Sequence, residues 1–211
     1  MNKQVPVLTD QPVGVSVVRD ARGLESFHDP ACAAAIWDRE VPSDVIAWLA
    51  NLDAETLPNG RIILQAKAVS SAIVHLCDIA EMPKGRQRDW LAEDIADLAQ
   101  RFADVMQVAN VRLRVQAVTT NACRKFHRDA IAGRLVCTYR GTGTQYGTAA
   151  SGDDPSYIFT APTGAPILLR GTLWPPEPDT GLLHRSPPIE GTGETRLVLV
   201  LDPIFDLEDP E

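Results

Sequence analysis

The feature that most restricts the fold is a change of pattern at Asn110. From this residue onward, short apolar stretches are separated by clusters of glycine and proline, and residues 111–118 (VRLRVQAV) alternate apolar with polar side chains. A period of two is typical of a half-buried strand, and many short strands between Gly/Pro turns are typical of a sandwich or jelly roll. Further strands are expected at residues 135–139, 145–146, 157–160, 167–170, 182–184 and 196–201.

The first half of the chain has mainly helical patterns. Residues 86–108 carry apolar side chains at spacings of three and four, which predicts a long amphipathic helix. Other helices are expected at residues 30–37, from 42 onward and at 70–79, a short strand at 13–18, and either a strand or a helix entry at 61–64. We therefore expect an α+β fold in which a helical region, residues 1–109, packs on a β region, residues 110–211, as one compact unit.

Size and charge limit the classes of function. The chain has 211 residues, 45% of them hydrophobic, which favours one domain with a sizeable core. The net charge of -8 argues against a nucleic-acid surface, which needs clustered Lys and Arg. A small acidic substrate stays compatible, because local charge in a pocket can oppose the net charge. No stretch approaches the ~18 apolar residues of a membrane span, and the polar residues 1–11 lack a signal-peptide core, so we expect a cytoplasmic protein.

Residues 123–129 (CRKFHRD) place an imidazole and a carboxylate two positions apart. In an extended strand, His127 and Asp129 would point to the same side. A second histidine, His184, follows far downstream. Two histidines and one carboxylate with open positions suit non-haem Fe(II). Cys123 is a further candidate ligand, and a thiolate beside an imidazole would favour zinc in a closed site; we prefer to read Cys123 and Cys137 as small buried residues of a sheet.

Four segments, in this order, resemble the Fe(II)/2-oxoglutarate-dependent dioxygenase superfamily, whose fold is a cupin-like double-stranded β-helix. They are residues 125–129 (KFHRD), 168–171 (LLRG), 184–188 (HRSPP) and 195–199 (TRLVL), and they lie between about residues 110 and 203. The whole chain also resembles an uncharacterised bacterial family, through the pattern Cys-x-x-x-His-x-Asp and through residues 137–141 (CTYRG). The helical first half has no motif of the superfamily.

The resemblance implies roles for particular residues. His127, Asp129 and His184 would bind Fe(II), and Arg196 would bind the distal carboxylate of 2-oxoglutarate. Arg185 competes for that role, although as the neighbour of His184 it should point to the opposite face. Thr138 and Tyr139 are further candidates for contact with the oxo-acid.

The resemblance also implies an activity, that of an oxygenase or hydroxylase acting on a small molecule or a protein side chain. The alternative is a non-catalytic, cupin-like metal-binding protein that handles zinc, and a third interpretation is an interaction module with a vestigial site. The sequence indicates neither the substrate nor the oligomeric state.

Three other aromatic side chains need separate interpretations. His28 precedes Asp29 and Pro30, which is typical of a surface residue at a helix start. His75 lies beside Leu76 on an expected apolar helix, which favours a core histidine. Trp174 stands in a Pro-rich segment, and either lines a pocket mouth or anchors that segment by packing.

Overall fold

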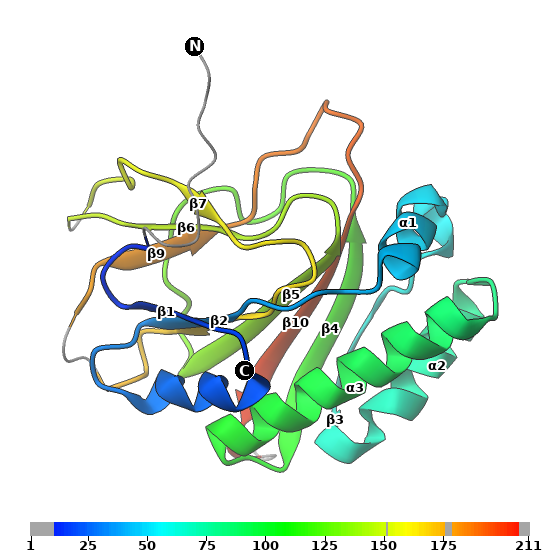
Figure 1. Cartoon of the computed structure of the whole chain (residues 1–211), viewed down its shortest axis with the longest axis horizontal. Helices are drawn as coiled ribbons and strands as arrows, with labels where there is room; N and C mark the ends of the chain where they lie inside the picture. Colours follow the sequence, from blue (N-terminus) through cyan, green and yellow to red (C-terminus); the bar gives the residue numbers. More distant parts are fainter. Residues whose placement is uncertain (1–10, 151, 176–178, 207–211) are drawn as a thin grey trace.

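The computed structural model describes residues 11–150, 152–175 and 179–206. Residues 1–10, on which the expectation about a signal peptide largely rests, lie outside this part. The described strands form two sheets that face each other (Figure 1): a seven-stranded sheet of order β1-β2-β8-β5-β10-β4-β3 and a three-stranded sheet of order β7-β6-β9. The strands are β1 Val15–Val18, β2 Ala34–Trp37, β3 Gly60–Gln65, β4 Asn110–Val118, β5 Gly133–Arg140, β6 Gln145–Thr148, β7 Phe159–Thr160, β8 Ile167–Arg170, β9 Leu182–Arg185 and β10 Arg196–Ile204.

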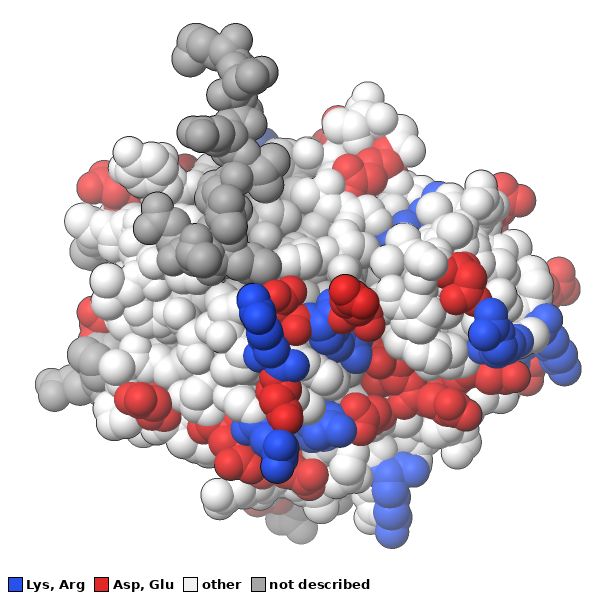
Figure 2. Space-filling view, viewed as in Figure 1, with Lys and Arg blue, Asp and Glu red and all other residues white. Residues whose placement is uncertain are grey.

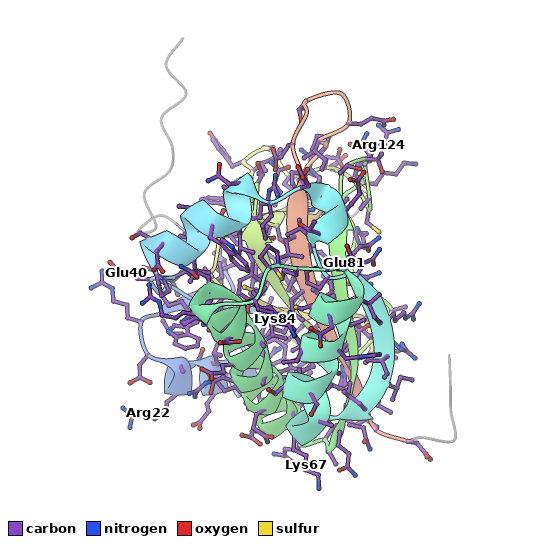
Figure 3. The ribbon with its side chains drawn as sticks, turned by 90° about the vertical axis from the view of Figure 1, so that its right-hand side faces the viewer. Arg22, Glu40, Lys67, Glu81, Lys84 and Arg124 are labelled. Atoms are coloured by element: carbon purple, nitrogen blue, oxygen red, sulfur yellow. The ribbon has the colours of Figure 1, made fainter. Side chains whose placement is uncertain are left out.

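Three helices cover the outer face of the large sheet, as the turned view shows (Figure 3). They are α1 Ser43–Asn51, α2 Val69–Ile79 and α3 Arg86–Met106, and short 3₁₀ helices lie at Ala21–His28, Ala54–Thr56 and Ala66–Ala68. The apolar stripe expected on residues 86–108 is confirmed, because the core side of α3 is fully buried. Within the described residues, no helix has both the length and the apolar character needed to cross a bilayer.

Alternation along the central strands separates the two faces of the large sheet. On β4, Val111, Leu113 and Val115 join the core beneath the helices. The residues between them, including Arg114, face the small sheet, since successive side chains of a strand point to opposite faces. A second core lies between the two sheets and includes Val198 from β10. One face of the large sheet therefore supports the fold, and the other is available for a site.

The first half of the chain is less helical than expected. It contributes β1, β2 and β3, which form the two edges of the large sheet, so residue 109 does not separate a helical layer from a β layer. The helix expected at residues 30–37 is wrong: Ala34–Trp37 is β2, parallel to β1 and antiparallel to β8. The high helix propensity of alanine is a weak preference, and burial between two strands overrides it. The expectations for residues 13–18, 61–64 and 70–79 are resolved as strand, strand and helix.

Charged side chains of both signs are interspersed over the lower and right-hand parts of the face in Figure 2.

His75, expected in the core, is instead exposed on α2, while Ile73 and Cys77 on the same helix are buried. A helix buries only one stripe, and His75 falls outside it.

Candidate metal centre

Two imidazoles and one carboxylate, from distant parts of the chain, meet on a wall of the space between the sheets. One ligand atom each from His127, Asp129 and His184 lies within 4.8 Å of the other two. Nε2 of His127 is 3.6 Å from Oδ1 of Asp129, and Nε2 of His184 is 3.1 Å from Oδ2. These are the residues that the sequence pattern selected as ligands.

The backbone holds the two histidines together. His127 and His184 form an isolated antiparallel bridge, and their ring centroids are 4.6 Å apart. His184 belongs to β9, whereas His127, for which an extended strand was expected, lies outside the regular strands. It lies in an irregular segment between β4 and β5, where only this single residue pairs with a strand.

A second backbone contact positions Asp129. The N–H of Thr172 donates a hydrogen bond to the carbonyl oxygen of Asp129 at 2.8 Å, and the N–H of Leu173 donates to Ile131 at 3.1 Å. Gly171 permits this close approach, because a Cβ there would lie 1.9 Å from the carbonyl oxygen of Ile131. The turn after β8 therefore fixes the loop that carries the carboxylate.

Each imidazole has a different environment. Nδ1 of His127 is 2.8 Å from the carbonyl oxygen of Lys125, so Nδ1 is the protonated donor and Nε2 carries the free lone pair. The nearby carboxylate of Asp129 favours the protonated ring and raises the pKa of His127, and partial burial opposes that shift. Burial lowers the pKa of His184, which favours the neutral imidazole that a metal requires.

The Asp129 carboxylate is held ionised. Burial alone would raise its pKa, but contacts with the two imidazoles and the charge of Arg134 bring the pKa well below its usual range. Nη1 of Arg134 donates to Oδ1 at 2.7 Å. Oδ2 is buried and accepts no hydrogen bond from the described residues, although His184 lies nearby. A buried anionic oxygen without a donor fits a cation.

Arg134 and Asp202 support this carboxylate and were not identified from the sequence. Arg134 donates from Nε and Nη2 to the two oxygens of Asp202, at 2.7 and 2.9 Å. The alternation of side chains along β5 and β10 could have indicated the face on which each residue lies. Arg134 lies two residues before Val136 and so on the same face of β5. Asp202 lies one residue beyond the predicted end of β10, at residue 201.

The centre opens into a cavity between the sheets. Its floor is the inner face of β4, β10 and β5, and its walls carry His127, His184 and Cys123. Arg196 lies in the floor and is only 1% exposed. Its Nε donates to the carbonyl oxygen of Thr142 at 2.6 Å, and its Nη2 donates to Oγ1 of Thr138 at 3.2 Å. Burial lowers the pKa of Arg196 to about 10, which leaves it a cation at neutral pH.

Thr138 and Tyr139, the candidates for contact with an oxo-acid, face opposite sides of β5. Thr138 lies beside Arg196. Tyr139 is buried on the helix side of β5, where its hydroxyl donates to Asp94 Oδ2 of α3 at 2.5 Å, so it does not face the cavity. Arg185 does not turn away from the site: it lines the same cavity, donates to Gln145 at 2.8 Å and stacks on Phe126 at 4.4 Å.

The cysteines separate into two kinds. Cys123 is exposed on the cavity wall, which corrects the preferred interpretation of a buried sheet residue, but it does not belong to the three-residue ligand cluster. Its neighbour Arg124 points outward at the edge of the molecule (Figure 3). Cys137 is buried on the helix side, and burial raises its pKa to about 12.

Trp174 both packs as an anchor of its segment and lines a cavity, so both interpretations of this residue apply. Its ring packs edge-on against Phe27 at 4.8 Å and lies under the guanidinium of Arg170 at 4.8 Å. It also lines a second cavity, beside Arg128. His28 is exposed, as expected, but it is the last residue of the 3₁₀ helix Ala21–His28 and does not precede a helix start.

A model of the family described as "Protein of unknown function (DUF1826)" matches residues 18–202. The chain belongs to this family. The DUF1826 region takes in the candidate metal centre, both sheets and the three helices, except for residues outside the match at either end. No curated protein matches the sequence.

Several solved structures with some similarity to this DUF1826 chain carry the name of a dioxygenase or an oxygenase. One is dioxygenase for auxin oxidation 1 from Arabidopsis thaliana, in a complex with 2-oxoglutarate, with 10% identity, a TM-score of 0.50 and coverage of 94% of this chain and 95% of that one. The rice dioxygenase for auxin oxidation has 11% identity, a TM-score of 0.47 and coverage of 95% and 85%. An oxidoreductase of the 2-oxoglutarate–Fe(II) oxygenase family from Burkholderia pseudomallei has 14% identity, a TM-score of 0.42 and coverage of 89% and 93%. At this identity the likeness to the Arabidopsis protein describes the fold, a mixed jelly roll with a large antiparallel sheet.

Proposed function

We propose that this protein is an Fe(II)- and 2-oxoglutarate-dependent oxygenase. The observation that supports this most is the pairing, in one cavity, of a three-residue ligand cluster with a buried guanidinium. His127, Asp129 and His184 form the cluster. Arg196 lines the same cavity, and none of the described carboxylates forms an ion pair with it.

His127, Asp129 and His184 would hold the iron. Their donor atoms, two imidazole nitrogens and a carboxylate oxygen, match the set that non-haem Fe(II) accepts, and three protein ligands leave coordination positions open. Bound there, Fe(II) would supply oxidation of a substrate by O₂, coupled to decarboxylation of the oxo-acid. The unpartnered oxygen of Asp129 supports a cation at this position.

The remaining residues would bind and position. Arg196 would bind the distal carboxylate of 2-oxoglutarate with a two-pronged, charge-assisted hydrogen bond, which is strong where water is excluded. Thr138 orients that guanidinium, and Arg134 fixes Asp129. Val198 and Val200 give the floor of the cavity an apolar part. A small molecule that enters this cavity is the substrate we favour over a protein side chain.

The test adds Fe(II) and 2-oxoglutarate without oxygen to metal-stripped protein. We expect a weak visible charge-transfer band in the wild type. Arg196→Met should lose the band and keep the metal, because only the oxo-acid loses its partner. Tight binding of added zinc by the stripped protein, with no band from Fe(II) and 2-oxoglutarate, would favour the non-catalytic, zinc-handling alternative and would contradict the oxygenase proposal.

A further inference from the structure

The cavity carries more positive charge than the proposed metal and oxo-acid need. Four arginines line it: Arg114, Arg134, Arg185 and Arg196. Arg134 is neutralised by Asp129 and Asp202. The other three form no ion pair with a carboxylate of the described residues, and among these residues only the neutral Gln145 forms a hydrogen bond with Arg185. In a chain of net charge -8, this local excess is a property of the cavity.

Arg114 is the least satisfied of these cations. It is half-buried on the cavity face of β4, and in the described part of the chain no group forms a hydrogen bond or ion pair with its guanidinium. Burial lowers the pKa of Arg114, and the charge of Arg134 adds to that shift. An arginine held in this way is available to an anion from outside the chain.

The neighbouring strand adds a second cation, Arg61, which forms no ion pair with the described residues. Arg61 on β3 lies directly opposite Arg114 in the antiparallel pair, so both side chains occupy the same face of the sheet. Like charges directly opposite destabilise a sheet. A bound anion would remove this repulsion, so the pair itself favours a ligand of negative charge.

The register places Arg114 apart from Arg196 and close to the metal centre. Arg196 pairs with Val118, four residues from Arg114 along β4, a separation of roughly 13 Å at the rise of a strand. Arg114 pairs with Val200, which also pairs with Val136 of β5, two residues from Arg134. An anion at Arg114 would therefore not compete with an oxo-acid at Arg196, and would lie at the end of the cavity where Arg134 holds Asp129.

We propose that the substrate oxidised at this centre is a small carboxylic acid, and that Arg114 binds its carboxylate. The role of this acid as a substrate rests on the proposed function, whereas the anion site itself rests only on the charges of the cavity. A single guanidinium matches a singly charged, planar carboxylate in its two-pronged geometry. Gln116, two residues along the same face of β4, lines the cavity beside it and can donate a further hydrogen bond.

The test measures binding of benzoate and of its neutral analogue, benzamide, to the full chain without added metal, by calorimetry at low salt. We expect the wild type to prefer benzoate, and Arg114→Gln to reduce benzoate affinity by about tenfold or more, the effect of losing a charged hydrogen-bond partner. Arg86→Gln is the matched control, because it removes the same charge from α3, where the side chain is 80% exposed. Arg196→Met should keep the preference for benzoate.

Three results would overturn the proposal. Arg114→Gln could bind benzoate as the wild type does, or Arg196→Met alone could abolish the preference, which would leave a single anion site for the oxo-acid. Phenyl phosphate could bind about tenfold or more tightly than benzoate through Arg114, which would make the ligand a phosphate. Misfolding does not obscure the test, because removal of the like-charge pair should leave Arg114→Gln as stable as the wild type or more stable.

The outcomes also separate this inference from the proposed function. Benzoate binding through Arg114 without a charge-transfer band would retain the anion site and reject the oxygenase. A band that requires Arg196, with no benzoate preference, would retain the oxygenase and reject the acidic substrate.

Discussion

His127 and His184 exchange two backbone hydrogen bonds, each 3.0 Å long, although they lie far apart in the sequence. This bridge brings the two imidazoles together without using either side chain. Truncation of a ring therefore leaves the bridge in place, so alanine variants at these positions test metal binding rather than folding.

Gly171→Ala should weaken metal binding without touching a ligand. The new Cβ would meet the carbonyl oxygens of Ile131 and Asp129, at 1.9 and 2.7 Å, and the loop that carries the carboxylate must move. We expect metal affinity to fall by about tenfold or more, as when a supporting contact of a ligand is lost. Equilibrium dialysis against Mn²⁺ measures this. Gly152→Ala is the control, since, apart from its chain neighbours, no atom of the described residues lies within 4 Å of its Cβ and its φ of +91° alone brings strain. Equal losses in both variants would mean that Gly171 has no particular role.

Arg134→Met should destabilise the fold as well as the site. It leaves Asp129 and Asp202, which are 15% and 9% exposed, without their shared cation. Removal of one partner from a largely buried ion pair costs about 2–4 kcal/mol of unfolding free energy, which urea denaturation measures. Arg101→Met breaks an exposed pair with Asp97 on α3, and should cost about 0.5 kcal/mol or less. If Arg134→Met loses as little unfolding free energy as Arg101→Met, then solvent replaces the ion pairs of Arg134 with Asp129 and Asp202.

Stability should fall in alkali because of Cys137. Burial raises its pKa from 9.0 to about 12, so above pH 9 the unfolded state loses a proton that the folded state keeps. The unfolding free energy then decreases as pH rises, by up to about 1.4 kcal/mol per pH unit for one such group. The expected observation is a slope between about pH 9.5 and 10.5 that is roughly 1 kcal/mol per pH unit shallower in Cys137→Ala than in the wild type.

Cys123→Ala is the matched control for this slope, since that thiol is exposed. Its slope should equal that of the wild type. If Cys137→Ala also leaves the slope unchanged, then Cys137 does not keep its proton in the folded state.

Local pattern was enough to predict most elements and to single out the three side chains that meet in the candidate metal centre. The period of α3 and the alternation of β4 specify which face of each is buried, and residues 127, 129 and 184 stand out because few other histidines occur. The large, mainly antiparallel sheet followed from many short strands between turns, whereas the separate helical first half did not hold. These features depend on near neighbours in the sequence, which a single chain displays directly.

The errors arose where distant strands decide the outcome. Ala34 to Trp37 became a strand because β1 and β8 lie on either side. Tyr139 faces α3 and Arg185 reaches the cavity, because the pairing of the sheets, rather than adjacency to His184, determines what each side chain meets. Arg134 and Asp202 are joined only by the register of β5 and β10, so no local pattern marks them as a pair.

The most direct test of the account is titration of metal-stripped protein with Fe(II) under anaerobic conditions, or with Mn²⁺ in its place. The account predicts one saturable site in the wild type and in His75→Ala, whose imidazole is exposed on α2. His127→Ala, Asp129→Ala and His184→Ala should each lose about a hundredfold or more in affinity, because two protein ligands do not hold a divalent ion tightly. Binding to His184→Ala at wild-type affinity would contradict the account.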